Sequence, residues 1–459
     1  MDYSGLLKKI CQKGAEFSDI RLSNSTSEVV SLENGNLNLV QKDISRLYGA
    51  RVFYKGARGF AYGTDFNKAE KALQSAFKLA KSNSKRLKEK FKLSNFGTFK
   101  ANIKSKGTSF TEVELDNVVK KLLECDSILN KKPVVNRNVD AGFSRKNQAY
   151  FNSFGSNIEQ TREYFNFRFA AVGKKSGNLR KVFDKVGMCA SYDDFEKIEF
   201  EKMIKTQLNL FPELFRAKKA PAGNYPLIMD PVLSHVFFHE AVGHACEADA
   251  ILENSSVLKD AIGKKIGPVC LTLSDDARIE KEHGFFKYDD EGMKSNGTIL
   301  IKNGILNNYL HSIETASRLG MKPTGNCRAE NASSFPYPRM SNIVLHDGKY
   351  KFQELFEGIK KGIYAKSSTG GVVEPTNGNF LFNTKEAYLI ENGKITKPVL
   401  DVSFGGNILQ ILPKIEKVAN DSKVVFGGWS CGKKGQMVPV GGKSPHIKIS
   451  EVMVGGQNE

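Results

Sequence analysis

The stretch His235 to Asp249, HVFFHEAVGHACEAD, decides how this part of the chain must fold, because it contains the pattern H-E-x-x-x-H. In the shorter helical pattern H-E-x-x-H, two histidines four residues apart lie about 40° apart around the helix axis, and both can bind one metal ion. Here His239 and His244 are five residues apart, which places them about 140° apart on a regular α-helix. A regular helix therefore cannot bring the two imidazoles together.

A local π-helical turn would restore their alignment. Its backbone hydrogen bonds join residues five apart, so one extra residue is absorbed, and such turns are concentrated at functional sites. Gly243, directly before the second histidine, favours the irregular backbone that this insertion requires. We therefore expect a helix that widens, or ends, between His239 and His244.

The glutamate of the pattern has a natural chemical role if the histidines bind a metal ion. Glu240 is adjacent to the first candidate ligand, so its carboxylate can take a proton from water at the metal and return it to a leaving amine. His235, four residues before His239, is interpreted as a histidine on the helix face. Glu240 is thus the candidate catalytic residue.

A catalytic zinc ion needs a third protein ligand and keeps a fourth position open. The spacing leaves several candidates open: Cys246, Glu247, Asp249, Glu253 and Cys431. Cys246 would point away from the histidines on a continuing helix, which favours a place in the core. Glu247 and Asp249 favour supporting or capping roles. Cys431 lies in a glycine-rich segment, FGGWSCGKKGQMVPVGG, where a thiolate could approach a metal ion.

Around this motif, the chain is predicted to have an α+β fold with two domains. Helical patterns near 3–16, 66–82 and 111–126 alternate with extended segments, including 134–173. Residues 192–216 are expected to be helical with an interruption at Pro212, and 217–223 (AKKAPAG) to be a linker. We expect an N-terminal mixed α/β domain at 1–216 and a mostly β C-terminal domain at 217–459 that carries the histidine helix.

Composition limits the other classes of function. The 459 residues carry a net charge of +18, and the basic excess is concentrated in residues 81–106. This region lacks a zinc finger or an RNA-binding aromatic motif, so we expect a lysine-rich loop after a helix there and do not expect nucleic-acid binding. No segment resembles a signal peptide or a membrane span, and the seven scattered cysteines form no C-x-x-C pair. A cytoplasmic protein without disulfides is expected.

Three further segments, taken with the histidine motif, resemble the TldD/PmbA family of metalloproteases, and in particular its catalytic TldD-type subunit. They are GNCRAENASSFPYPRMSNIVL (325–345), GGVVEPTNGNFLFNTKEAYLIENGKITKPV (370–399) and CGKKGQMVPVGGKSPHIKI (431–449). The resemblance implies a zinc peptidase with His239, His244 and Cys431 as metal ligands and Glu240 as the catalytic glutamate.

The resemblance also implies substrates and partners. Members of the family cleave peptides or unfolded segments inside a cavity that a dimer encloses, either as homodimers or paired with a PmbA-type relative. We expect extended peptides to pair with a sheet edge, for which the segment STGGVVEPT (368–376) is the candidate. The alternative interpretation is a non-catalytic, metal-containing binding or assembly subunit.

Overall fold

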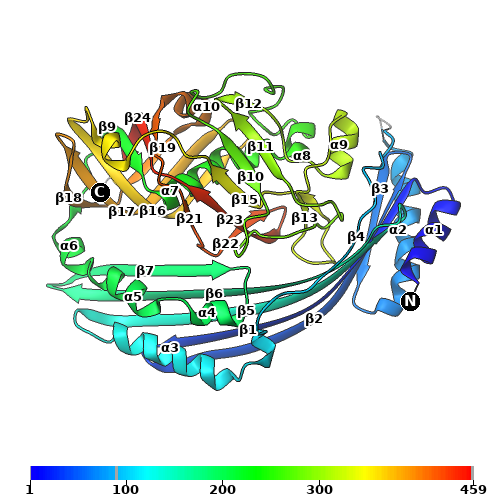
Figure 1. Ribbon diagram of the computed structural model, residues 1–459, viewed down its shortest axis with the longest axis horizontal. Coiled ribbons are helices and arrows are strands. Elements are labelled where there is room, and N and C mark those ends of the chain that lie inside the picture. The colour runs from blue at the N-terminus through cyan, green and yellow to red at the C-terminus, as the bar shows by residue number, and fades with distance from the viewer. Residues whose placement is uncertain (1, 88–90, 456–459) are drawn as a thin grey trace.

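The computed structural model describes residues 2–87 and 91–455. In its N-terminal half, one mixed sheet has the strand order β3-β2-β1-β5-β6-β4, and β7 pairs with β6. Its strands are β1 (Phe17–Glu33), β2 (Asn36–Tyr54), β3 (Ala57–Gly63), β4 (Lys100–Ile103), β5 (Val134–Asn152), β6 (Asn157–Lys175) and β7 (Asn178–Met188). Figure 1 shows this sheet as a long curved blade that passes beneath the second half of the chain.

Helices cover the outer face and one end of the blade. They are α1 (Tyr3–Gln12), α2 (Ala69–Ser84), α3 (Leu115–Leu129), α4 (Tyr192–Glu196), α5 (Phe200–Leu208) and α6 (Phe211–Arg216). The strands alternate, so that Phe165, Phe167 and Phe169 of β6 all face the same side, where they pack with Phe195 and Phe200 of the helices. The opposite, more polar face of the sheet faces the second half of the chain.

The second half contains two larger sheets. One has the order β16-β9-β24-β19-β17-β18-β8, and because β16 also pairs with β17, five of its strands close into a ring. Its strands are β8 (Lys218–Lys219), β9 (Gly223–Met229), β16 (Lys361–Glu374), β17 (Asn379–Glu391), β18 (Lys394–Leu400), β19 (Ser403–Asn407) and β24 (Ile447–Gly455), with β20 (Ile415–Val418) paired to β24.

The other large sheet has the order β12-β11-β10-β15-β23-β21, with β22 paired to β23. Its strands are β10 (Leu273–Asp276), β11 (Gly297–Lys302), β12 (Ile305–Leu306), β15 (Asn342–Leu345), β21 (Lys423–Val424), β22 (Trp429–Lys433) and β23 (Gln436–Ser444). A separate short pair joins β13 (Cys327–Arg328) to β14 (Tyr337–Pro338).

Helix α7 (Pro231–Phe238) packs between the two large sheets of this half, against β16 on one side and β15 and β23 on the other. Leu233, Phe237 and Phe238 are fully buried, and the Phe237 ring contacts the rings of Phe380 and Phe382. Short helices α8 (Ala248–Leu252), α9 (Ile313–Leu319) and α10 (Ile408–Ile411) lie on the connections. The α+β class with a mostly β second half is as predicted from the sequence.

Three local expectations need correction. Residues 192–216 form three short helices, with breaks before Phe200 and Phe211, and Pro212 lies in the first turn of α6, where its missing N–H is not needed. The expected linker contains β8, which pairs with β18. The basic region includes a short strand, β4, as well as the end of α2, while its residues 88–90 lie outside the described residues.

No helix within residues 2–87 and 91–455 has the length and apolar character needed to cross a membrane.

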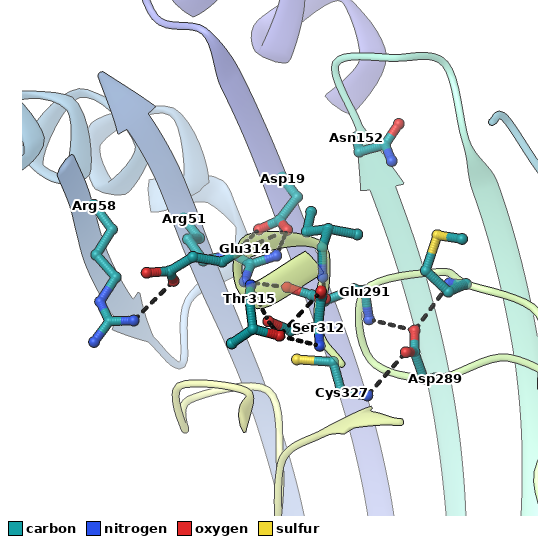
Figure 2. Close-up of polar contacts among 12 residues, drawn as sticks. Asp19, Arg51, Arg58, Asn152, Asp289, Glu291, Ser312, Glu314, Thr315 and Cys327 are labelled. Atoms are coloured by element: carbon teal, nitrogen blue, oxygen red, sulfur yellow. Dashed lines mark hydrogen bonds and ion pairs between the residues drawn. The ribbon is translucent and has the colours of Figure 1, made fainter. Parts of the chain in front are cut away.

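A buried ion cluster connects the blade to the second half of the chain (Figure 2). The guanidinium of Arg51 on β2 contacts Asp19 of β1 at 2.5 Å and Glu291 of the second half at 2.6 Å. Glu291 also accepts a hydrogen bond from the backbone N–H of Ile313, at the start of α9. All three charged side chains are at most 2% exposed, so each charge depends on its partners for compensation.

Replacing Arg51 should therefore destabilise the whole chain. We expect Arg51→Met to lower the free energy of unfolding by about 3–5 kcal/mol, because it leaves two buried carboxylates without their counter-ion. Urea denaturation followed by circular dichroism measures this loss. The matched control is Lys42→Gln, which breaks a far more exposed ion pair with Glu28 and should cost less than about 1 kcal/mol. Equal losses in the two variants would contradict this account of the cluster.

Candidate metal centre

The histidine motif lies where α7 changes its helical pitch. Asp230 caps α7, since its carboxylate accepts hydrogen bonds from the N–H of Leu233 at 2.8 Å and of Ser367 at 2.9 Å. After Phe238 the backbone widens into a π-helical turn, η3 (His239–Gly243), in which the N–H of His244 donates to the carbonyl of His239. The π-helical turn expected from the five-residue spacing is confirmed.

The reason for a glycine at position 243 differs from the expected one. Gly243 has ordinary right-handed helical dihedral angles, with φ −56° and ψ −54°. A Cβ atom at this position would lie 1.8 Å from the sulfur of Met340. Glycine is therefore required for close packing of the turn against Met340, rather than for backbone freedom.

The turn brings His239 and His244 together with Cys431. One donor atom from each of these three residues lies within 4.8 Å of the others. Cys431 comes from β22, where it pairs with Val438 of β23, and its Sγ lies 3.4 Å from Nε2 of His244. The three candidate ligands thus converge from segments that are far apart in the sequence.

The electrostatics of the three residues favour a charged thiolate. Burial alone would raise the pKa of the Cys431 thiol, but the imidazoles of His239 and His244 outweigh it and lower that pKa to about 4. For His244, burial acts against the charged form, and Glu247 and Cys431 raise its pKa well above the ordinary value. A deprotonated cysteine is the form that binds metal ions.

The donor set fits a zinc ion. Two imidazoles and one thiolate are ligands that zinc accepts in tetrahedral sites, where neighbouring donors lie about 3.5 Å apart. The Sγ to Nε2 distance of 3.4 Å between Cys431 and His244 is close to this value. Nδ1 of His239 is buried without a hydrogen-bond partner among the described residues. Three protein ligands would leave the fourth position of such an ion open for water or substrate.

Glu247 orients the second histidine. Its carboxylate lies 3.2 Å from Nδ1 of His244, the ring nitrogen that does not face Cys431. Burial alone would raise the pKa of Glu247, yet Lys433, 3.0 Å away, and His244 lower it to about 2. A carboxylate in this position fixes the tautomer and the orientation of a metal-binding histidine.

Two basic residues that the sequence reasoning did not single out support this arrangement. Lys433 contacts both Glu247 and Asp249, while Arg339 donates to the backbone carbonyl of Cys431 at 2.5 Å. The sequence contained a signal for Lys433. It follows Cys431 by two residues, and residues two apart on a strand face the same side of the sheet. Arg339 carried no comparable local signal.

Glu240 faces open space beside the cluster. Its carboxylate lies 3.6 Å from Nε2 of His244, and the side chain is 28% exposed. It lines a cleft of about 760 Å³ between the blade and the second half of the chain, together with Trp429 and residues 368–371 of β16. A substrate in this cleft would therefore meet Glu240, whose carboxylate is next to the candidate ligand His244.

The remaining sequence candidates have other roles in the structure. Cys246 is fully buried in the hydrophobic core, which raises the pKa of its thiol above the ordinary range. Asp249 binds Lys433 at 2.7 Å, and Glu253 binds Lys434 at 2.7 Å. His235 is buried, with its ring centre 5.3 Å from the centre of the Trp429 ring. None of these four joins the candidate metal cluster found among the described residues.

Comparisons with known sequences show which family and which proteins the chain is similar to. The family model for the PmbA/TldA metallopeptidase C-terminal domain matches residues 222–456, and that for PmbA/TldA metallopeptidase domain 1 matches residues 18–84. Metalloprotease MJ0996 of Methanocaldococcus jannaschii is 36% identical over 446 residues, covering 95% of this chain and 96% of that protein. A zinc metalloprotease TldD homolog of Saccharolobus solfataricus is 38% identical over 236 residues, 51% of this chain and 52% of that protein.

Solved structures share the fold over nearly the whole chain. TldE from Thermococcus kodakarensis matches with a TM-score of 0.78 at 20% identity, covering 98% of this chain and 99% of that one. A protein of Thermotoga maritima, described as a putative modulator of a DNA gyrase, matches with a TM-score of 0.80 at 21% identity and covers 98% of both chains. At these identities the matches show the fold alone.

Proposed function

Because the chain belongs to the TldD/PmbA family of metallopeptidases, we propose that it is a zinc-dependent peptidase that hydrolyses extended or unfolded peptides. The convergence of His239, His244 and Cys431 beside the open carboxylate of Glu240 carries this proposal. We assign the three converging residues as the zinc ligands. Glu240 is the catalytic residue.

Each residue of the site has a separate role in the proposed peptide hydrolysis. When bound, a zinc ion would supply a Lewis acid that polarises the scissile carbonyl and makes water more acidic. Glu240 accepts a proton from the attacking water and delivers it to the leaving amine. Glu247 keeps His244 in one orientation and one tautomer. Lys433 and Arg339 hold Glu247 and the Cys431 backbone in place.

An open strand edge supports the proposal that substrates bind in extended form. On one side β16 pairs with β17 as far as Glu374, but on the other side its pairing with β9 ends at Ala365. Beyond that point no described strand covers this edge, and Thr369 to Gly371 are exposed along the cleft that contains Glu240. A peptide could add to this edge through its backbone, so its side chains would need little recognition.

We extend the proposal to the domain division and the cellular location of the chain. Residues 1–216 would form an N-terminal domain whose blade covers one wall of the cleft, and residues 217–459 would form the metallopeptidase domain. The seven cysteines are all free thiols, which suits the reducing conditions of the cytoplasm. A location in the cytoplasm is therefore part of the proposal.

We also propose that a dimer encloses the cleft, formed with a second copy or with a TldE-type relative of the same fold. Residues 36–47 of β2 extend beyond its pairing with β3, and no described strand pairs with this edge. It carries exposed apolar side chains, among them Leu37, Leu39 and Ile44. Light scattering, on the chain alone and mixed with such a relative, measures the mass in solution. A monomer in both samples would contradict this part of the proposal.

The peptidase proposal is tested by Glu240→Gln. We expect this variant to retain zinc and to lose at least about 100-fold in kcat on an unstructured peptide, because the amide cannot accept the proton. Zinc content by elemental analysis and peptide cleavage by mass spectrometry are the two readouts. The matched control is Glu253→Gln, which removes an exposed carboxylate paired with Lys434 outside the cleft and should leave kcat unchanged.

The alternative, a non-catalytic subunit, predicts a different result for the same proteins. TldE of Thermococcus kodakarensis matches this fold over 99% of its length at 20% identity, and a match at this identity shows the fold and not an activity. If wild type retains zinc and cleaves no faster than Glu240→Gln, alone or mixed with a TldE-type relative, the peptidase proposal is wrong.

A further inference from the structure

Four side chains form a row across the inner face of the blade. Ser31, Asp140, Arg168 and Lys185 are direct neighbours on β1, β5, β6 and β7. The carboxylate of Asp140 accepts hydrogen bonds from the Ser31 hydroxyl and from Nε of Arg168, the latter at 2.7 Å. Asp140 therefore neutralises Arg168, and Lys185 is left at the end of the row without a carboxylate of its own.

The position of Lys185 is electrostatically unfavourable. Like charges directly opposite on neighbouring strands destabilise a sheet, and Lys185 lies opposite Arg168. The neighbouring Asp184 compensates this charge only in part, because its carboxylate lies 3.5 Å from the ammonium of Lys385. Lys185 forms no ion pair within the described part of the chain. A cation maintained in this setting is available to an anion from outside.

Lys185 lines the same cleft as the candidate catalytic residue Glu240. Its ammonium is 4.9 Å from the centre of the Trp429 ring, and Trp429 precedes Cys431 by two residues on β22. Lys185, Trp429 and Glu240 line the same cleft of about 760 Å³. The side chain of Lys185 is exposed to the cleft, where partial desolvation and the charge of Arg168 lower its pKa to about 8, so that the ammonium remains charged at neutral pH.

The basic character continues along the cleft. A second hollow of about 720 Å³ shares Lys181, Phe183 and Thr369 with the first, so the two are continuous. Lys181 lies on the same face of β7 as Lys185, four residues away, which is about 13 Å along a strand. It also forms no ion pair with a described residue. The second hollow is further lined by Arg180, by Lys219, by Lys385, which pairs with Asp184, and by one additional acid, Asp401.

We propose that Lys185 binds a carboxylate of the substrate close to the scissile bond, that Lys181 binds a second one farther along, and that the chain thereby selects acidic peptides. This inference rests on the proposed peptidase function and gives it a substrate class. The carboxylate can come from an aspartate or glutamate side chain or from a free peptide C-terminus, since both offer the same anion to an ammonium group.

Binding measurements test this inference separately from catalysis. Zinc-loaded Glu240→Gln protein is titrated with fluorescent, unstructured peptides that carry glutamate, glutamine or lysine at one position in turn, with free or amidated C-termini. In the Lys185→Gln background the preference for glutamate over glutamine should fall roughly tenfold. Lys185→Arg should restore the preference, and Lys185→Glu should shift it towards lysine. If binding is tighter only for peptides with a free C-terminus, and does not depend on glutamate in the sequence, Lys185 binds a carboxylate and that carboxylate is the peptide C-terminus.

The matched control is Lys175→Gln, an exposed lysine near the end of β6 that lines neither hollow. It should leave the peptide preference unchanged. Within the Glu240→Gln background, equal preferences with Lys, Gln and Glu at position 185 would overturn the inference. An equal loss in Lys175→Gln would also overturn it, because it would show a general effect of net charge. Binding is measured in a variant that does not cleave the peptide, so the peptide preference is measured independently of catalysis. If the wild-type protein cleaves no peptide, the peptidase function is refuted, but the binding preference for acidic peptides is still decided by these titrations.

Discussion

The structure of the site depends on one constraint, which is that two histidines five residues apart must face the same point. A regular helix cannot satisfy it, and the π-helical turn from His239 to Gly243 does. Because such a turn has no stability advantage of its own, the surroundings must maintain it. The Asp230 cap fixes the start of α7, and the close contact of Gly243 with Met340 leaves no room for the turn to shift.

The remaining parts of the site are placed by long-range structure. Cys431 is 187 residues from His244 in sequence and reaches it because β22 pairs with β23, which is itself joined to β15 beneath α7. Glu247, Lys433 and Arg339 then connect the histidine segment to the cysteine strand through charged contacts in a buried environment. Such buried charges are stable only when all partners are present, so the same contacts that orient His244 also fix the two segments relative to each other.

The sequence allowed prediction of those features of the site that depend on residues close together in the chain. The spacing of His239 and His244 predicts the π-helical turn, and the direction of Cys246 on a continuing helix favours a place in the core, where the structure has it. The third ligand could not be derived from spacing, since Cys431 meets the histidines only through sheet pairing; a family resemblance supplied it. The function of Gly243 was misjudged, because its partner Met340 is nearly a hundred positions away. The row of side chains from Ser31 to Lys185 could not be predicted from the sequence, because it is formed only by the pairing register of four strands.

Anomalous diffraction at the zinc edge, on crystals of the protein loaded with zinc, tests the central claim most directly. The account predicts one strong peak at about 2.0–2.3 Å from a ring nitrogen of His239, Nε2 of His244 and Sγ of Cys431, with the fourth side open towards Glu240. A peak bonded to Cys246 or Asp249 in place of Cys431 would contradict the ligand assignment. The absence of any peak between the two histidines would show that the π-helical turn does not form a metal site.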